Sequence, residues 1–486
     1  MENHFNYYKK NIIGNDLIFT TPYGKKKMIY ADWIASGRLY APIEDKITNL
    51  FGPFVGNTHT ETSETGTLMT KAYHYAHELI KKHVNANEND VIITAGPGMT
   101  TVINKMQRLL GLRSSTKCES MSERNEEDIP VVFITHMEHH SNQTSWFETN
   151  AELVQIEPTK DLLVDMDDLR KKLKQYESRK FKIGSFTACS NVTGIEIPYR
   201  ELAKIMHENG GVCFIDFAAS APYVDMDMHP KDPLEKLDCV FFSPHKFLGG
   251  PGSSGVMIFD SSLYHCDVPD NPGGGTVDWT NPWGEYKYID DIEIREDGGT
   301  PGFLQAIRTA LCLEVKNQMG VENIRKKEAE LVKIAFKELR KIPNLKILAD
   351  NSEERLGIIS FFIENIHFNL IVKILNDRFG IQVRGGCACA GTYGHYLLDL
   401  SFDQSHEISE LVISGDLSQK PGWIRISLHP TMTIDEAYFI FDAIKQIAEN
   451  NEEWRKDYIY NIHINEYRHV NEPIDKTEKI VDWFKF

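Results

Sequence analysis

The sequence has few cysteines and no long apolar run. These two features argue against a disulfide-stabilised protein and against a membrane-spanning one. Eight cysteines in 486 residues are too few for a disulfide framework. No apolar stretch approaches the roughly 18 residues that cross a bilayer. The first residues, MENHFNYYKKNIIGNDLIF, lack the apolar core and cleavage site of a signal peptide. We therefore expect a cytoplasmic protein with reduced thiols and no membrane partner.

Basic residues are also in short supply. Lys and Arg number 53 against 70 Asp and Glu, which gives a net charge of −17. Such a chain is a poor match for nucleic acid or for an anionic membrane surface, and we expect neither as a partner. Hydrophobic residues at 41% and charged residues at 25% are typical of a globular protein. The length predicts two or three domains.

Strand-like and helix-like segments alternate from about residue 85. Short β-branched runs such as DVIITAGPG, IPVVFITH and VCFIDFAAS end in Gly- or Ser-rich turns, and amphipathic stretches follow most of them. This alternation predicts an α/β fold with a mostly parallel sheet sandwiched by helices, and ligands bind such sheets at the carboxyl ends of the strands. The polar stretch 114–130 reads as a loop or insertion.

The pattern of predicted helices and strands changes near residue 300. TPGFLQAIRTALCLEVKNQMG reads as one long helix, and further helices alternate with the strands RLGIISFFI and GWIRISLH. These segments predict a smaller C-terminal α+β domain. We place the boundaries at 1–30 for an N-terminal segment packing near the small domain, 31–302 for the large domain, 303–450 for the small domain and 451–486 for an extension of unknown role.

Two charged residues follow predicted strands. Lys246, in FFSPHKFLGGPGSSG, stands between an apolar run and a glycine loop. This setting suits an amine that must lose its proton to form an imine, although a surface lysine in a turn looks the same. Asp216, in GVCFIDFAAS, ends an apolar run. A buried carboxylate needs a cation, such as the protonated ring nitrogen of pyridoxal phosphate (PLP); a helix cap or structural ion pair is the alternative.

Two further stretches carry weaker patterns. TAGPGMTT (94–101) is a Gly-rich turn opening a helix, where free N–H groups attract phosphate, but it matches neither a Walker loop nor GxGxxG. THMEHHSN (135–142) contains three histidines and one glutamate, and its spacing matches no zinc motif. We therefore predict no metal and favour an imidazole lying flat against an aromatic cofactor.

The stretch VRGGCACAGTYGHY (383–396) places Cys387 and Cys389 one residue apart among small residues. A metal site would need two further ligands, and no second CxC or CxxC occurs in the sequence. The other six cysteines lie in apolar runs or loops, and we expect them to be structural: Cys118, Cys189, Cys213, Cys239, Cys266 and Cys312.

Together these motifs resemble class V, fold-type I PLP-dependent enzymes. The resemblance rests on SPHK, on Asp216 after an apolar strand, and on EHHSN, GGTPG and a cysteine after RGG, and it runs from about residue 28 to 447. The cysteine desulfurase and selenocysteine lyase branch is the most similar. GNTHTETS, VIITAGPG and the CxC segment are also similar to the PLP domain of molybdenum cofactor sulfurases.

The resemblance implies a role for each matching residue. Lys246 would bind PLP covalently, Asp216 would face the pyridine nitrogen and His139 would stack on the ring. Asn191 and Arg425 would hold the substrate carboxylate, which a planar guanidinium can grip with two hydrogen bonds.

The resemblance also implies how the phosphate is bound and how the chain assembles. The candidate phosphate ligands within one chain are Ser243, His245 and the backbone of Gly96, Pro97 and Gly98. Thr300, in GGTPG, would reach the phosphate of a neighbouring subunit, so a homodimer is expected.

In a cysteine desulfurase, a thiolate on a mobile loop attacks the substrate sulfur and keeps it as a persulfide. Counted from Arg384, the catalytic position falls on Cys389. Cys387 is an auxiliary thiol that passes sulfur on or shields the persulfide, or simply a small buried residue. The resemblance thus implies cleavage of the C–S bond of L-cysteine, or the C–Se bond of selenocysteine, to give L-alanine, with a sulfur-acceptor protein as partner.

Two departures from the family pattern leave other activities open. Ala219 stands where a glutamine usually contacts the PLP phenolic oxygen, and Pro97 and Gly98 replace common hydroxyl residues. The alternatives are another class V activity (aminotransferase, epimerase or C–N lyase) or an inactive PLP-binding sulfur carrier or scaffold. Release of alanine and sulfide from cysteine would separate the first reading from the others.

Overall fold

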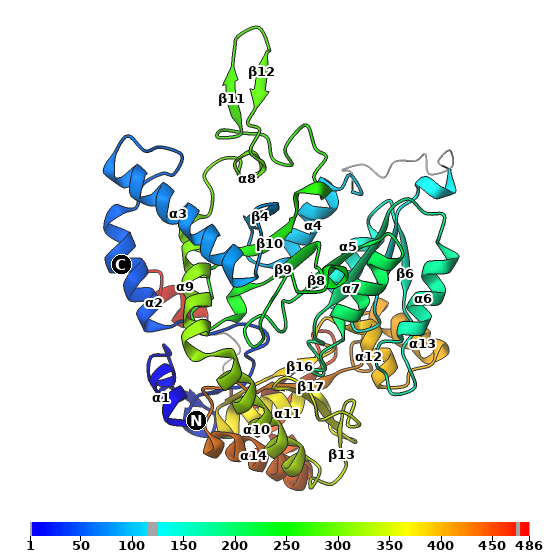
Figure 1. Ribbon diagram of the computed structural model, residues 1–486. Coiled ribbons are helices and arrows are strands. Elements are labelled where there is room, and N and C mark those ends of the chain that lie inside the picture. Colours follow the sequence, from blue (N-terminus) through cyan, green and yellow to red (C-terminus); the bar gives the residue numbers. More distant parts are fainter. Residues whose placement is uncertain (1, 114–124, 473–476, 486) are drawn as a thin grey trace.

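A seven-stranded sheet forms the centre of the computed structural model, which describes residues 2–113, 125–472 and 477–485 (Figure 1). The strand order is β4-β10-β9-β8-β7-β5-β6. β10 runs antiparallel to both neighbours, and the pairs among β5 to β9 are parallel, so the predicted mostly parallel sheet is confirmed. The strands are β4 (Asp90–Ala95), β5 (Val131–Ile134), β6 (Glu152–Gln155), β7 (Lys182–Thr187), β8 (Val212–Asp216), β9 (Cys239–Phe242) and β10 (Gly255–Asp260).

Helices cover both faces of this sheet, which explains why its strands are continuous apolar runs. Successive side chains of a strand point to opposite faces: Phe133 packs in one core, and Val132 and Ile134 pack in another. The first core includes residues of α3 (Glu64–His83), α6 (Met166–Gln175), α7 (Tyr199–Glu208) and α9 (Phe303–Met319). The second includes residues of α4 (Met99–Leu109) and α5 (His140–Phe147), with α8 (Ile292–Arg295) at its edge.

A smaller antiparallel sheet follows in the C-terminal part, with the order β13-β14-β17-β16. Its strands are β13 (Leu345–Ile347), β14 (Ile358–Ile363), β16 (Arg384–Gly386) and β17 (Trp423–Ser427). Its separate core contains apolar residues of α10 (Val321–Leu339), α11 (Phe368–Ile374) and α14 (Ile434–Trp454). On α14 the buried residues recur at helical spacing, and a capping box begins the helix. Two further helices, α12 (Gly391–Leu397) and α13 (Phe402–Ile413), follow β16.

The N-terminal residues contact both parts of the molecule: Phe5, Tyr8 and Ile43 pack in the first core, whereas residues 18–31 lie against the second sheet and its helices. The N-terminal elements are α1 (Glu2–Lys10), β1 (Ile18–Thr21), β2 (Gly24–Lys27), β3 (Ile29–Tyr30) and α2 (Ala41–Asp45). β3 pairs in parallel with β15 (Ile381–Gln382), just before the CxC segment. Thr21 Oγ1 donates to the Asp377 carbonyl at 2.7 Å, and Lys9 forms an ion pair with Glu436 at 2.5 Å. The first 30 residues therefore contribute backbone and ionic contacts to the C-terminal part.

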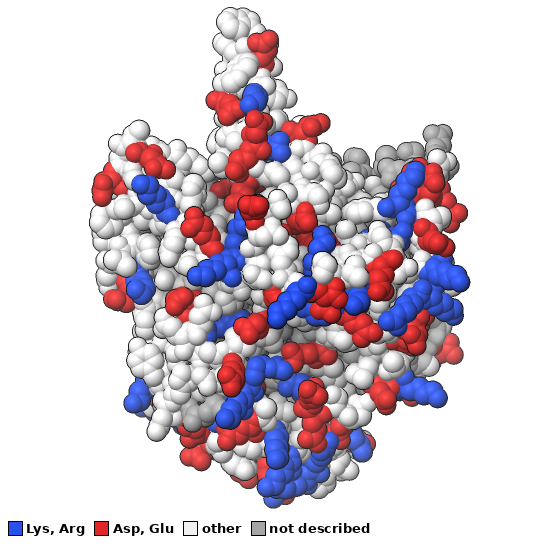
Figure 2. Space-filling view, in the orientation of Figure 1, with Lys and Arg blue, Asp and Glu red and all other residues white. Residues whose placement is uncertain are grey.

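Two hairpins extend from these layers. β11 (Val277–Thr280) and β12 (Tyr286–Tyr288) project at the top of Figure 1. β18 (Tyr458–Asn461) and β19 (Glu466–His469) form a C-terminal hairpin, and α15 (Thr477–Asp482) follows. Acidic and basic side chains are interspersed over the face of the molecule in Figure 2.

Several sequence-based expectations meet the described residues here. No helix in the described ranges is long and apolar enough to cross a membrane. Cys189, Cys213, Cys239 and Cys312 are buried and Cys266 is partly exposed, all as free thiols. Cys118 and most of the predicted 114–130 loop lie outside the described residues; a short 3-10 turn, Glu126–Asp128, follows.

Candidate active site

A cavity of about 210 Å³ lies at the carboxyl ends of the central strands, beside the loop that joins β16 to α12. We call residues 387–390 the cysteine loop. The fold brings eight of the residues singled out in the sequence to the wall of this cavity: Lys246, Asp216, His139, Asn191, Ser243, His245, Arg425 and Cys389.

Lys246 and Asp216 come from neighbouring parallel strands. Asp216 is the last residue of β8, and Lys246 ends the 3-10 turn that follows β9, so both side chains reach the same sheet edge. Burial lowers the pKa of Lys246 to about 8; Asp216 opposes this shift, and the guanidinium groups of Arg425 and Arg384 add to it. Burial raises the pKa of Asp216 to about 6. The site thus contains an amine that readily loses its proton and a carboxylate that lacks a strong cationic partner.

His139 forms the N-cap of α5. Its Nδ1 accepts a hydrogen bond from the backbone N–H of Ser141 at 3.1 Å. Burial, together with the charge of Lys246, lowers the pKa of His139 to about 3. The imidazole is therefore neutral at physiological pH, and it lines the cavity as an aromatic surface.

The predicted phosphate-binding residues gather around the N-terminus of α4. Ser243 Oγ accepts from the Met99 N–H at 2.9 Å, and His245 Nδ1 donates to the Pro97 carbonyl at 2.9 Å. A β-carbon on Gly98 would lie 3.0 Å from His245 Cε1 and 3.1 Å from Ser243 Oγ, so glycine keeps the space between them open. The adjoining depression, of about 640 Å³, is lined by Gly96, Pro97, Gly98, Ser243 and His245, among others. A helix N-terminus with a hydroxyl and an imidazole is suited to an anion.

Thr300 lies elsewhere. Its side chain is exposed, and it is not among the described residues that line the cavity or the adjoining depression of its own chain. A contact between Thr300 and a phosphate would therefore have to involve a second subunit, and this role stays a prediction.

Arg425 is buried on β17 and is held by two acceptors. Its Nη2 donates to Asp32 Oδ1 at 3.0 Å, and its Nη1 donates to the Asn191 carbonyl at 3.2 Å. Asp32 Oδ2 is in turn 3.3 Å from Arg384 Nε. Arg425 Nε and Asn191 Oδ1 are buried without a hydrogen-bond partner among the described residues. Such atoms are uncommon in proteins, and their presence here suits the binding of a polar ligand.

The cysteine loop lies between two hollows. Cys389 is exposed and lines both the 210 Å³ cavity and a groove of about 1390 Å³, whereas Cys387 is partly buried and lines the groove. Ala388 and Cys389 have φ angles of 53° and 56°, a left-handed conformation that is uncommon for residues other than glycine. Asn191 Nδ2 donates to the Ala388 carbonyl at 2.7 Å, and the His140 N–H donates to the Cys389 carbonyl at 2.8 Å. These bonds fix the loop beside the cavity.

The sequence did not reveal four other residues of the site. Asp32 is a single acidic residue after the short strand β3. Its neighbours in the sequence do not indicate that it pairs with Arg384 and Arg425. Cys189, expected to be structural, lines the cavity, as does Thr187 at the end of β7. Glu138 was considered only as a metal ligand.

Glu138 instead ties three elements together below His139. Its Oε1 accepts from Thr135 Oγ1 at 2.7 Å and from the Thr187 N–H at 3.0 Å, and its Oε2 accepts from Asn142 Nδ2 at 2.7 Å. Burial raises its pKa to about 7. In the described part of the chain, no three His, Cys, Asp or Glu side chains are arranged to hold a metal ion.

Comparison with known proteins places this site in a family. The family model for class V aminotransferases matches residues 29–438. The chain belongs to the class V aminotransferase family. The chain is 28% identical over 373 residues to a probable cysteine desulfurase of Halalkalibacterium halodurans, covering 75% of this chain and 84% of the relative. It is 29% identical over 385 residues to a probable cysteine desulfurase of Staphylococcus epidermidis, covering 78% and 87%.

Solved structures share the fold of this chain. A cysteine desulfurase from Thermococcus onnurineus, in its apo form, has a TM-score of 0.72 at 20% identity, over 91% of this chain and 98% of its own. The cysteine desulfurase CsdA from Escherichia coli has a TM-score of 0.68 at 21% identity, over 86% and 94%. At these identities the likeness concerns the fold, and it confirms the predicted fold-type I architecture.

Proposed function

We propose that this class V protein is a PLP-dependent cysteine desulfurase that releases L-alanine from cysteine, or from selenocysteine, and keeps the sulfur or selenium on Cys389. The two relatives named probable cysteine desulfurases support this assignment. The observation that carries it is the position of Cys389, an exposed thiol that lines the same cavity as Lys246. A transaminase has no use for a nucleophile at that position.

The residues of the cavity fit PLP on three separate grounds. Asp216 is a buried carboxylate whose one hydrogen bond among the described residues comes from the Ala218 N–H at 2.8 Å, so a protonated pyridine nitrogen would supply its missing cation. The opening beside Gly98 presents Ser243, His245 and the α4 N-terminus to a phosphate. Lys246 offers an amine whose pKa is lowered to about 8.

The chemistry then divides between the cofactor and the protein. PLP, when bound, supplies the electron sink that weakens bonds next to the amino-bearing carbon. Arg425, fixed by Asp32, is placed to hold the substrate carboxylate. Lys246, whose pKa is lowered to about 8, is placed to take a proton from the substrate and return one.

Cys389 completes the reaction. Its thiolate attacks the substrate sulfur, an S–S bond forms and the C–S bond breaks. The electron pair of the broken bond stays with the substrate carbon, which is then protonated to give alanine. The left-handed turn at Ala388 and Cys389 and its bonds to Asn191 and His140 hold the thiol at the cavity wall.

The test is an assay of the PLP-loaded protein with L-cysteine and dithiothreitol. We expect alanine and sulfide in equal amounts, and alanine and selenide when selenocysteine replaces cysteine. Transfer of the amino group to a keto acid without sulfide would overturn the proposal in favour of another class V activity. Bound PLP with neither product would indicate a sulfur-carrying or inactive scaffold.

A further inference from the structure

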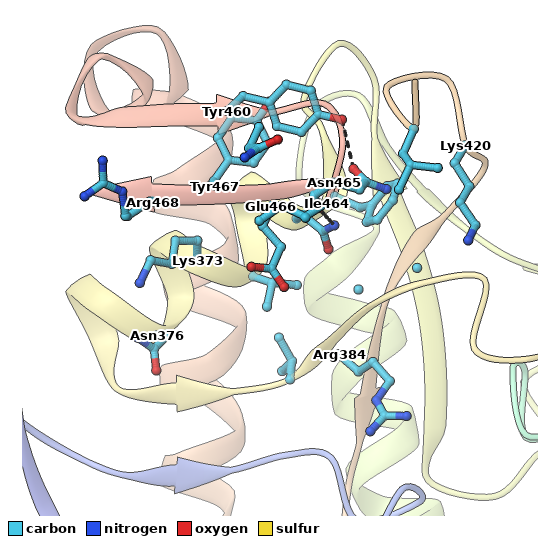
Figure 3. Close-up of a pocket in the computed structure, with 18 of the residues that line it drawn as sticks. Lys373, Asn376, Arg384, Lys420, Tyr460, Ile464, Asn465, Glu466, Tyr467 and Arg468 are labelled. Carbon is cyan, nitrogen blue, oxygen red and sulfur yellow. Dashed lines mark hydrogen bonds between the residues drawn. The ribbon is translucent and has the colours of Figure 1, made fainter. Parts of the chain in front are cut away.

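The C-terminal hairpin β18–β19 lies beyond the residues that match the class V family, and it forms one wall of the 1390 Å³ groove. The opposite side of this hairpin groove includes residues of β16, together with Cys387, Ala388 and Cys389. Figure 3 shows the hairpin with Tyr460, Tyr467 and Arg468 above, Lys373 and Asn376 at one side, and Lys420 on a separate loop. A segment without an assigned role thus faces the two thiols.

The hairpin is anchored to the small domain. Asn369 Nδ2 of α11 donates to the Asn465 carbonyl at the turn (2.5 Å), and the Leu417 N–H donates to the Ile462 carbonyl (2.9 Å). At its base, Tyr458 and His469 are buried and their rings meet edge to face. The groove is therefore a formed surface with one wall supplied by the extension.

The hairpin groove is larger than a site that binds only a small thiol compound. Small-molecule sites usually occupy about 300–1,000 Å³ and enclose their ligand, whereas this groove measures about 1390 Å³. Three isoleucines that line it are strongly exposed: Ile459 by 53%, Ile464 by 58% and Ile480 by 46%. Exposed apolar side chains gathered along a groove are typical of a surface that a polypeptide covers.

The charge of the groove is opposite to that of the whole chain. Its charged lining residues are Lys373, Arg384, Lys420, Arg468, Glu466 and Glu472, four basic against two acidic, in a protein of net charge −17. Glu472 is paired with Lys373 at 2.5 Å. Arg384 points away from the hairpin in Figure 3, and its Nε lies 3.3 Å from Asp32.

Lys420 is the cation that remains beside the cysteine loop. It is exposed and forms no ion pair with a described residue. Lys420 lines the same groove as Cys387, Ala388 and Cys389, and its charge adds to the burial that lowers the pKa of His140. His140 Nε2 accepts from the N–H of Gly391, immediately after the cysteine loop, at 2.9 Å. A carboxylate entering the groove near the thiols would therefore meet Lys420.

We propose that the hairpin groove is the docking site of the sulfur acceptor. The acceptor presents a polypeptide segment that contains a cysteine flanked by acidic residues, together with apolar residues that cover Ile459 and Ile464. This assignment rests on the proposed desulfurase function. It gives residues 458–469 the role of selecting the acceptor.

The transfer step is balanced without an external oxidant or reductant. The acceptor thiolate attacks the outer sulfur of the Cys389 persulfide, and a new S–S bond forms on the acceptor. The bond between that sulfur and Cys389 Sγ breaks, and Cys389 leaves as a thiolate. The proton of the persulfide stays with the transferred sulfur, so both the charge and the oxidation level are conserved.

Binding can be measured with the PLP-loaded protein and short fluorescent peptides, without turnover. The first probe carries a serine in place of the cysteine, flanked by glutamates and followed by leucines; the second has lysines in place of the glutamates. We expect saturable binding of the acidic peptide, and binding of the basic peptide weaker by about tenfold or more. Equal affinity for both peptides, or no saturable binding of the acidic one, would overturn the proposal.

Variants locate the binding surface. Lys420→Glu should weaken the acidic peptide by about tenfold and strengthen the basic one, and Ile464→Ser should weaken both by a few-fold. The matched controls are Lys346→Glu and Ile413→Ser, at exposed positions outside the groove, and they should leave both affinities unchanged. Loss of binding in the controls, or none in Lys420→Glu and Ile464→Ser, would contradict the assignment.

Sulfur transfer separates this proposal from the function on which it rests. With dithiothreitol as acceptor, Lys420→Glu should form alanine at the rate of the unchanged protein, whereas transfer to the cysteine-containing acidic peptide should fall by about tenfold. Alanine formation with dithiothreitol but no preference for the acidic peptide would overturn the docking site alone. Peptide binding in the expected pattern without any alanine would overturn the desulfurase function and leave a peptide-binding groove.

Discussion

Cys389 and Cys387 are separated by one residue, yet they face different parts of the molecule. Cys389 lines both the active-site cavity and the hairpin groove, while Cys387 lines the groove. A thiol that touches both spaces can receive sulfur on one side and release it on the other. Cys387 can act only after sulfur has left the cavity, so the two cysteines should contribute unequally.

The first prediction is that Cys389→Ser abolishes sulfide release from cysteine, with a loss of at least about 10³-fold, or about 4 kcal/mol in the barrier. Cys387→Ser should cost about tenfold or less. Mass spectrometry after a pulse of cysteine should find added sulfur on the loop peptide of Cys387→Ser and none on that of Cys389→Ser. Cys266→Ser, at a partly exposed cysteine elsewhere, is the control. The reverse labelling pattern would make Cys387 the nucleophile.

The second prediction concerns Lys246, whose pKa is lowered to about 8 by burial. Only the unprotonated amine can bond to PLP, so the rate at which the PLP-free protein captures PLP should rise with pH and level off above about pH 8. The sign follows because a lowered lysine pKa releases the proton at lower pH. Stopped-flow absorbance between pH 6.5 and 10 measures the profile. A rate that keeps rising about tenfold per pH unit toward pH 10 would show an ordinary lysine.

At the scale of elements, the sequence predicted those strands and site residues whose pattern lies within a few neighbouring residues. Apolar runs such as VVFI and VCFID predicted strands because both faces of the central sheet are buried. Lys246 and Asp216 were found because each follows such a run. The pairing of Asp32 with Arg425 could not be found in this way, because 393 residues separate the partners and neither flanking pattern refers to the other.

The position of the C-terminal hairpin also could not be predicted from the sequence. Its strands, YIYN and EYRH, mix polar and aromatic residues and are only partly buried, so they carry no clear alternation. Their position depends on contacts with α11 and with the 415–417 loop. Only the fold brings residues 458–469 to the cysteine loop, and the extension therefore remained unassigned from the sequence.

The third prediction tests the coupling of three elements through Asp32, which links Arg425 on β17 to Arg384 on β16. Both guanidinium groups already lower the pKa of Lys246. Asp32→Asn removes the charge that offsets them, so the pKa of Lys246 should fall further and the PLP-capture profile should move to lower pH by about half a unit or more. Asp16→Asn, at an exposed acid paired with Lys27, should leave the profile in place. A shift to higher pH would contradict the arrangement.

At the scale of the whole molecule, one predicted site residue lies apart from the site. Thr300 is exposed, and in its own chain it is not among the described residues lining the cavity or the adjoining depression. The projecting hairpin β11–β12 carries Trp283, which is 84% exposed. Both features suit a molecule that is completed by a second copy in a two-fold dimer, where each subunit reaches the other's site.

The last prediction uses this arrangement. If Thr300 acts on the neighbour's phosphate, Thr300→Glu should weaken PLP binding, because its carboxylate would repel the phosphate. Lys246→Ala should remove activity by taking away the amine that bonds to PLP. In a mixed dimer of the two variants, one site contains both defects and the other contains neither. Unfolding and refolding the variants together should therefore restore activity, up to about a quarter of that of the unchanged protein for random pairing. Refolding each variant alone is the control. If Thr300 acted within its own chain, every site in the mixture would retain a defect and no activity would return.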